Sequence, residues 1–230
     1  MLEDPPLLVI RKSFSRPAAD KLEKLKGAQT GHVVDAMNGR GALDAAIKPV
    51  DPLTAQFVGT AITCETGPSD NLAIMAAVAL AQAGDVVISA SDGFMSTAVC
   101  GDIVSMMAAN AGIQAIVIDG MARDSAGIVE AGLPVFSRGI TPNSCVRSGP
   151  GRVGHPIVAG GVAVQPGDVI VGDRDGVVVI PQAKLDEVIA RVEAIRNAEA
   201  AVIADVREKK LATRPNIAEL LKSDRVRYVD

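Results

Sequence analysis

Residues 85–124 constrain the fold more than any other stretch of this chain. Two apolar, β-branched runs, DVVI at 85–88 and AIVI at 115–118, flank a segment whose apolar residues recur at helical spacing. A strand, a helix and a second strand in this order predict a βαβ unit, the building block of an α/β fold. We therefore expect an α/β protein with a sheet that is at least partly parallel.

The loops of this unit carry its polar residues. One loop leads to Gly101-Asp102 at the start of the helix, and the other carries Asp119-Gly120 and then Arg123-Asp124. In α/β sheets the chemistry lies where strands release the chain at their carboxyl ends. The unit is thus predicted to bring carboxylates, one guanidinium and a helix N-terminus together.

The composition agrees with one α/β domain. A chain of 230 residues suits a single large domain, and its core material is Val, Ile, Ala and Leu, with no Trp, one Tyr and four Phe. Such a core favours a parallel or mixed sheet covered by Ala-rich helices.

Charge and cysteine usage exclude several classes of protein. A net charge of −4 with few aromatics argues against nucleic acid as a main ligand. Three widely spaced cysteines fit a reducing compartment. The acidic N-terminus is no secretory signal, and the apolar run near 72–83 is too short to span a bilayer. We expect a cytoplasmic protein that does not bind membranes.

The remaining elements follow from periodicity and turn signals. Residues 1–16 lack a pattern and are expected to form an arm, and 149–154 an irregular loop. Helices are predicted at 17–25, 30–37, 72–82 (after a turn and N-cap at Pro68 to Asn71), 124–131 and 185–209, and further strands at 57–64, 133–137, near 162, at 168–171 and at 177–180.

Three motifs suggest chemistry that their context does not support. Gly149 to Gly154 has the glycine spacing of a dinucleotide loop, but no strand leads in and His155-Pro156 prevents a clean helix. Asp173 to Gly176 opens like a calcium loop but lacks the Glu at the twelfth position, so a hairpin turn is the better interpretation. Cys100 has no recognisable base, which favours a buried thiol over a nucleophile.

Asp102, Arg123 and Asp124 allow two interpretations. Both carboxylates could cap helices while Arg123 pairs with them. Alternatively, a carboxylate holds a divalent cation and Arg123 binds a ligand carboxylate or enolate. The N–H groups of Ile103 and Val104 would then hold the other end of an anionic substrate. Glu199, on the C-terminal helix, is by itself best explained as a solvated residue paired with Arg196 or Arg207.

The spacing Asp102, twenty residues, Arg123-Asp124 resembles the D-X20-R-D signature of class II pyruvate aldolases of the RraA-like superfamily. Similar phrases run from about residue 20 to 210. They are VVDAM (33–37), FVGTAIT (57–63), SDNLA (69–73), GDVVI (84–88), IVIDGMARD (116–124), GLPVFSRGITP (132–142) and PGDVIVGDRDGVVVIP (166–181).

The resemblance implies the fold and the site. The fold would be a single-domain αββαβ-type sandwich resembling the phosphohistidine swivelling domain, with a core at about 20–182 and a C-terminal helical extension at 183–230. Asp124 would ligate Mg²⁺ or Mn²⁺, Arg123 would contact the pyruvoyl group, and the backbone of Gly101 to Val104 would bind the carboxylate. Asp102 would hold metal-bound water, joined by Glu199 from a neighbouring subunit of a homotrimer or homohexamer.

The resemblance also implies the activity. The enzyme would cleave 4-hydroxy-4-methyl-2-oxoglutarate or 4-carboxy-4-hydroxy-2-oxoadipate, small 2-oxo acids of aromatic compound catabolism, to pyruvate and a second oxo acid. Oxaloacetate decarboxylation would accompany it, because both reactions pass through the pyruvate enolate. Relatives often carry a His where this chain has Met75, so the choice of substrate stays open. The alternative is a non-catalytic regulator that binds an RNA-degradation enzyme.

Overall fold

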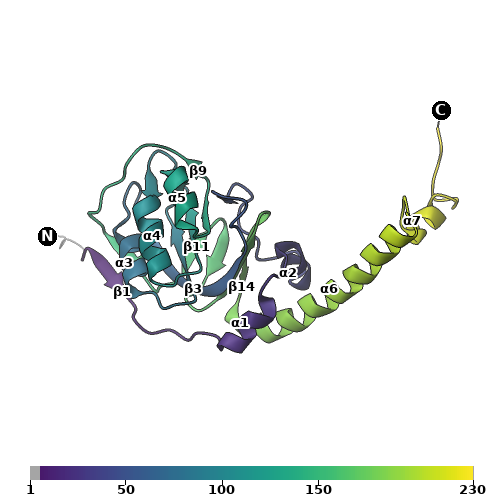
Figure 1. The fold of residues 1–230 in the computed structure, drawn as a ribbon, viewed down its shortest axis with the longest axis horizontal. Helices are drawn as coiled ribbons and strands as arrows, with labels where there is room; N and C mark the ends of the chain where they lie inside the picture. The colour runs from purple at the N-terminus through teal and green to yellow at the C-terminus, as the bar shows by residue number, and fades with distance from the viewer. Residues whose placement is uncertain (1–5, 230) are drawn as a thin grey trace. The chain divides into compact units, whose positions relative to one another are not determined.

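The computed structural model describes residues 6–229 (Figure 1). The helices are α1 (Ala19–Leu25), α2 (Thr30–Ala36), α3 (Leu72–Leu80), α4 (Asp102–Asn110), α5 (Ser125–Ala131), η1 (Gln182–Lys184), α6 (Leu185–Glu208) and α7 (Pro215–Leu220). The strands are β1 (Leu8–Ile10), β2 (Lys48–Pro49), β3 (Phe57–Thr66), β4 (Asp85–Ala90), β5 (Ala98–Cys100), β6 (Ala115–Asp119), β7 (Met121–Ala122), β8 (Val135–Ser137), β9 (Gly139–Ile140), β10 (Gly151–Val153), β11 (Ile157–Ala159), β12 (Val162–Val164), β13 (Val169–Asp173) and β14 (Gly176–Ile180).

A nine-stranded mixed sheet forms the centre of the fold. Its order is β1-β10-β3-β4-β6-β8-β2, and the β13–β14 hairpin joins it through β3. The four strands β3, β4, β6 and β8 are parallel, and the helices α3, α4 and α5 connect them in turn. The predicted βαβ unit is confirmed as β4, α4 and β6.

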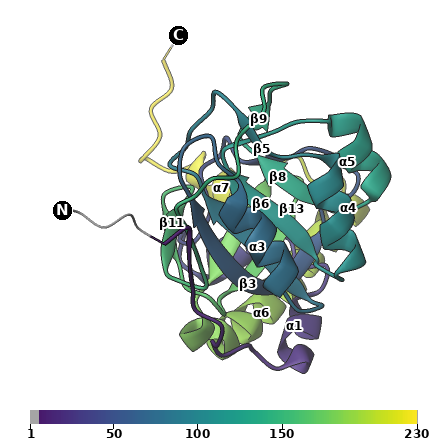
Figure 2. The same cartoon turned by 90° about the vertical axis from the view of Figure 1, so that its left-hand side faces the viewer.

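The alternation of side chains along the central strands separates two apolar cores. Ile62, Val87 and Ile116 face one side of the sheet, where they pack against α3, α4 and α5. Figure 2 shows these three helices on that face. Their neighbours in sequence, such as Val86 and Ala115, face the other side, where they form a second core with residues of the hairpins β11–β12 and β13–β14. Because both faces are covered, the central strands read as continuous apolar runs.

Two predictions about the ends of this sheet are wrong. Residues 8–10 of the expected arm form the strand β1, and residues 151–153 of the expected loop form β10, which lies between β1 and β3. The glycines and the Pro around β10 hide a three-residue strand whose partners are distant in sequence. Residues 1–5 of the expected arm lie outside the described residues. The turn at Asp173 to Gly176 is confirmed as a hairpin.

The chain divides into two units, residues 1–192 and 193–230. The first contains both cores and the beginning of α6, whose Leu185, Val188 and Val192 are buried. The second consists of the rest of α6 and α7. Within the described part of the chain, no helix combines the length and the apolar character needed to cross a membrane.

Candidate active site

A small second sheet, separate from the large one, positions the candidate site. The strands β5, β7 and β9 lie parallel in this order, and Cys100 pairs with Ala122. β5 is followed by Gly101-Asp102 and β7 by Arg123-Asp124. Two adjacent parallel strands thus release the chain side by side, and the backbone N–H of Arg123 donates to the carbonyl of Cys100 at 2.9 Å. The juxtaposition expected from the sequence exists, and these two short strands produce it.

Arg123 and Asp124 form the central ion pair of the site. The Nε of Arg123 lies 3.0 Å from the Oδ2 of Asp124, and the Nη1 of Arg123 donates a short hydrogen bond to the hydroxyl of Ser144. Asp124 has left-handed backbone angles, φ 54° and ψ 44°. Asp tolerates this region better than most residues, and such conformations concentrate at functional sites. The guanidinium is thereby held by two partners while part of it stays exposed.

Asp102 lies at the first turn of α4, with Gly101 at the N-cap position. Its Oδ1 accepts the N–H of Ile103 at 2.6 Å. The N–H of Ile103 is therefore not free to bind a substrate carboxylate in this conformation, unlike the prediction from the sequence. The N–H of Val104 has no acceptor among residues 6–229 and remains available for an anion at this helix N-terminus.

The absence of side chains at two glycines makes room for the side chains of Asp124 and Asp102. A Cβ at Gly101 would lie 2.6 Å from the Oδ2 of Asp124, and a Cβ at Gly127 would lie 2.6 Å from the Cβ of Asp102. Gly101 has φ −145°, which any residue can adopt. The absence of a side chain at Gly101 is therefore required by the carboxylate beside it and not by its backbone conformation.

These residues open into one cavity of about 250 Å³. It combines two carboxylates, two guanidiniums, two thiols and the N-terminus of α4 with a few apolar groups. The lining residues are Asn71, Met75, Ala98, Val99, Cys100, Gly101, Asp102, Ile103, Val104, Arg123, Asp124, Ser144, Cys145 and Arg147. Six of the seven candidate residues predicted from the sequence, all except Glu199, lie in this lining.

The seventh candidate, Glu199, lies on the exposed part of α6 in the unit 193–230. The described residues that line the cavity all belong to the unit 1–192. The capping interpretation holds only in part. Asp124 is at the N-cap position of α5 but makes no side-chain capping bond, whereas its predicted pairing with Arg123 is present.

The thiol of Cys100 is buried, as predicted. Burial raises its pKa to about 12, and contact with Ser105 offsets this only in part. Partial burial also raises the pKa of the Cys145 thiol. The thiol of Cys100 is therefore protonated at neutral pH, which removes it as a nucleophile.

The donors of the cavity fit a hard divalent cation. Within residues 6–229 no cluster of three or more His, Cys, Asp or Glu side chains is arranged to bind a metal. Asp102 and Asp124 nevertheless bring two carboxylates into one cavity, against glycines that leave them room. Mg²⁺ is commonly held by one or two carboxylates with water and substrate as its other ligands. This donor set suits Mg²⁺ or Mn²⁺ better than a cation that needs thiolate or imidazole ligands.

Sequence reasoning missed several lining residues. Asn71 was expected at a cap, but its side chain makes no capping bond and its Nδ2 donates to the carbonyl of Val99 at 3.1 Å. Ser144, Cys145 and Arg147 lie in a loop without periodicity. The only signal in that loop is its run of polar residues, which does not reveal that Ala98 pairs with Ser144.

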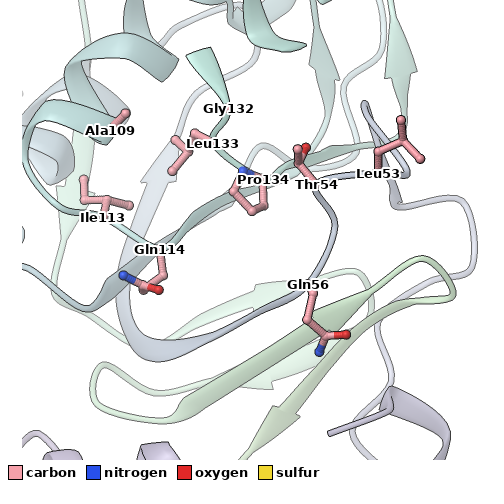
Figure 3. A pocket seen from close by; sticks show the side chains of 9 residues that line it. All are labelled: Leu53, Thr54, Gln56, Ala109, Ile113, Gln114, Gly132, Leu133 and Pro134. Atoms are coloured by element: carbon pink, nitrogen blue, oxygen red, sulfur yellow. The ribbon is translucent and has the colours of Figure 1, made fainter. Parts of the chain in front are cut away.

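A second hollow, of about 430 Å³, is built differently (Figure 3). Its lining carries amides, a hydroxyl and apolar groups but no titratable side chain: Leu53, Thr54, Gln56, Ala109, Ile113, Gln114, Gly132, Leu133 and Pro134. It offers no group for acid–base or metal chemistry, unlike the cavity at Arg123, which is the candidate active site.

Comparisons with known proteins relate the chain to one family. The family described as RraA-like (Aldolase/RraA) matches residues 30–179. A Halalkalibacterium halodurans protein, provisionally named 4-hydroxy-4-methyl-2-oxoglutarate aldolase, is 36% identical over 180 residues, which cover 78% of this chain and 85% of that protein. An uncharacterised Pseudomonas syringae protein of known structure has a TM-score of 0.76 at 28% identity, covering 90% of this chain and 100% of that one. The RNA-processing inhibitor RraA from Thermus thermophilus has a TM-score of 0.62 at 26% identity, covering 67% and 93%.

Proposed function

Because this chain belongs to the RraA-like (Aldolase/RraA) family, we propose that it is a divalent-metal-dependent class II pyruvate aldolase. Its substrates would be 4-hydroxy-4-methyl-2-oxoglutarate, 4-carboxy-4-hydroxy-2-oxoadipate or both, which it cleaves to pyruvate and a second oxo acid. The observation that carries the proposal is the Arg123–Asp124 pair, held beside Asp102 and the N-terminus of α4 in one cavity. The name of the Halalkalibacterium halodurans relative supports the same reaction.

The anionic end of the substrate would bind at the start of α4. There the free N–H of Val104 and the N-terminal end of the helix favour a carboxylate. The 2-oxo group would then lie against Arg123, whose guanidinium Ser144 and Asp124 hold in place. Cleavage takes the proton from the C4 hydroxyl, breaks the C3–C4 bond and leaves its electron pair as the enolate of pyruvate.

Arg123 would stabilise the negative charge that develops on the enolate oxygen. A preorganised donor that acts mainly in the transition state raises kcat more than it lowers KM. Asp102 would hold the water that takes up the C4 hydroxyl proton, and protonation of the enolate methylene then completes pyruvate. When bound at Asp124, with Asp102 nearby, Mg²⁺ or Mn²⁺ would act as a Lewis acid on the 2-oxo acid. Oxaloacetate would be decarboxylated as a side activity, since loss of CO₂ yields the same enolate.

A pyruvate assay tests the proposal. Lactate dehydrogenase would report pyruvate release from both aldol substrates and from oxaloacetate, with Mg²⁺, with Mn²⁺ and with a chelator. We expect metal-dependent release that falls by orders of magnitude in Arg123→Ala and Arg123→Lys. Arg152→Ala is the matched control, because Arg152 is an exposed arginine paired with Glu65 outside the cavity. Near-full activity of Arg123→Lys would contradict the role of Arg123.

We further propose a homotrimer or homohexamer in which Glu199 completes the site of a neighbouring subunit. On α6, Ile195, Val202 and Val206 recur at the three- and four-residue spacing of one helix face, and Glu199 falls within that stripe. On α4, Ile103, Met106 and Met107 are also exposed apolar side chains. Such surfaces on a folded chain suit association with a second copy.

Complementation between variants tests this shared site. Arg123→Ala and Glu199→Ala should each be inactive alone, and co-expression should restore activity, because some sites in a mixed oligomer then carry both native residues. Light scattering would give the number of subunits. Lack of restoration in a proven oligomer would place both residues in one subunit's site or would remove Glu199 from it.

The second candidate function is inhibition of an RNA-processing enzyme, which the similarity to the Thermus inhibitor favours. Binding would then proceed through protein surfaces, since the net charge of −4 disfavours direct RNA contact. Titrating the protein into a ribonuclease assay tests this function. Inhibition that persists in Arg123→Ala, without pyruvate release from wild type, would favour it over the aldolase.

A further inference from the structure

The cavity holds one positive charge that the groups around it leave unpaired. Asp124 pairs with Arg123, and Asp102 is bound to the N–H of Ile103 at the start of α4. Arg147 also lines the cavity, but it makes no ion pair or side-chain hydrogen bond with any of residues 6–229. A guanidinium has five donors in a planar fork that matches a carboxylate. The side chain of Arg147 is thus available to an anionic group of a ligand.

The backbone on both sides of Arg147 is fixed. Before it, the N–H of Val146 donates to the carbonyl of Ser69 at 2.8 Å, and the carbonyl of Val146 accepts the N–H of Asn71 at 3.1 Å. After it, the N–H groups of Ser148 and Gly149 donate to the Oδ2 of Asp70 at 2.5 and 2.9 Å.

Asp70 is only 4% exposed, and its other oxygen accepts the N–H of Leu72 at 2.8 Å. A buried carboxylate therefore holds the chain that follows Arg147. The base of this side chain has a fixed position at the cavity wall, as a binding group requires.

The positive charges of Arg147 and Arg123 both affect the pKa of the Cys145 thiol. Arg147 and Arg123 each favour the thiolate of Cys145 electrostatically, although partial burial is the larger influence and raises the pKa of this thiol. Arg123, Cys145 and Arg147 all line the same cavity. A ligand in this cavity can therefore contact both Arg123 and Arg147.

We propose that Arg147 is a specificity-determining residue that binds the second carboxylate of a dicarboxylic 2-oxo acid. This assignment deepens the proposed aldolase function and rests on it for the orientation of the substrate, with the 2-oxo acid end at Arg123. Substrates with a carboxylate beyond C4 would be preferred over 4-hydroxy-2-oxo acids that end in a methyl group. Arg147 takes no part in breaking the C3–C4 bond.

Two ligands of equal chain length isolate the second carboxylate. 2-Oxoglutarate and 2-oxopentanoate both carry the 2-oxo acid end, lack the C4 hydroxyl needed for cleavage, and differ in the distal carboxylate. Calorimetric titration of the Mg²⁺-loaded protein should show tighter binding of 2-oxoglutarate. In Arg147→Ala, the Kd for 2-oxoglutarate should rise about tenfold, as expected for loss of an exposed charge-assisted contact, while the Kd for 2-oxopentanoate changes less than about twofold.

Two further variants complete the test. Arg147→Lys keeps the charge without the planar fork and should fall between wild type and Arg147→Ala. Arg152→Ala removes an exposed arginine outside the cavity and should bind both ligands as wild type does. Equal effects of Arg147→Ala on the two ligands, or no effect on either, would overturn the assignment.

Kinetics separates this assignment from the proposed function. With 4-hydroxy-4-methyl-2-oxoglutarate, Arg147→Ala should raise KM about tenfold with little change in kcat, whereas 4-hydroxy-2-oxopentanoate should be turned over equally by both proteins. If wild type releases no pyruvate but retains the Arg147-dependent preference for 2-oxoglutarate, the aldolase proposal fails and Arg147 remains a dicarboxylate-binding residue.

Discussion

Replacing Gly101 by Ala tests the geometry of the site with a single methyl group. The backbone at Gly101, φ −145°, accepts Ala without strain. The new Cβ would lie 2.6 Å from the Oδ2 of Asp124 and 3.3 Å from the Cγ of Arg123. Ordinary contact begins near 3.4 Å, so the carboxylate must retreat by roughly 0.8 Å, and the ion pair with Arg123 moves with it.

A displacement of this size is expected to lower kcat/KM for pyruvate release about 100-fold, because reacting groups misplaced by about 1 Å lose that much rate. The free energy of unfolding should change by less than about 1 kcal/mol, since Ala restricts the unfolded chain and Asp124 is exposed enough to move. Gly67→Ala is the control, because a Cβ at Gly67 meets no atom within 4 Å. Activity of Gly101→Ala within twofold of wild type would refute the argument that Asp124 and Arg123 must occupy these positions.

Four further predictions concern the second glycine, the core and the thiols. Gly127→Ala should likewise lower pyruvate release in the coupled assay, because its Cβ would lie 2.6 Å from the Cβ of Asp102. An unchanged kcat/KM would contradict a role of Asp102 in the reaction. Phe136→Ala should destabilise the protein by about 3–5 kcal/mol in urea denaturation, because Phe136 is fully buried. Burial raises the pKa of the Cys64 and Cys100 thiols to about 12 from 9.0, so iodoacetamide at pH 8 should spare both until the chain unfolds. The thiols lose their protons near pH 9 in the unfolded chain but only near pH 12 in the folded chain, so the free energy of unfolding should be lower at pH 10 than at pH 8. Equal urea denaturation midpoints at the two pH values would contradict this.

The sequence predicted the parts of the fold that local patterns encode. The strands β3, β4 and β6 are long apolar runs, and α3 and α4 follow turn or cap residues, so periodicity located them within a few residues. The small sheet was missed because β5, β7 and β9 have only three, two and two residues, too few to show a period of two. Their pairing partners, like those of β1 and β10, lie far away in sequence.

The same distinction applies to the cavity. Asp102, Arg123 and Asp124 could be predicted because they lie in the segments that follow the long strands β4 and β6, and because their spacing resembles a family signature. Arg147 could not, because its position depends on the side chain of Asp70, 77 residues earlier, holding the N–H groups of Ser148 and Gly149. A cap-like pattern at Asp70-Asn71 suggested helix initiation, but the structure uses Asp70 mainly to fix a distant loop.

The candidate site lies on short strands and loops outside the nine-stranded sheet. The described cavity residues come from α3, α4, β5 and the segments around them, and none belongs to the nine-stranded sheet whose two faces carry the apolar cores. Substitutions at polar lining residues such as Ser144 and Arg147 can therefore change the ligand, whereas the lining residues Val99, Cys100 and Val104 also belong to one apolar core. A scaffold of this kind can diversify through a few loop residues, and proteins with quite different tasks can share it without sharing a mechanism.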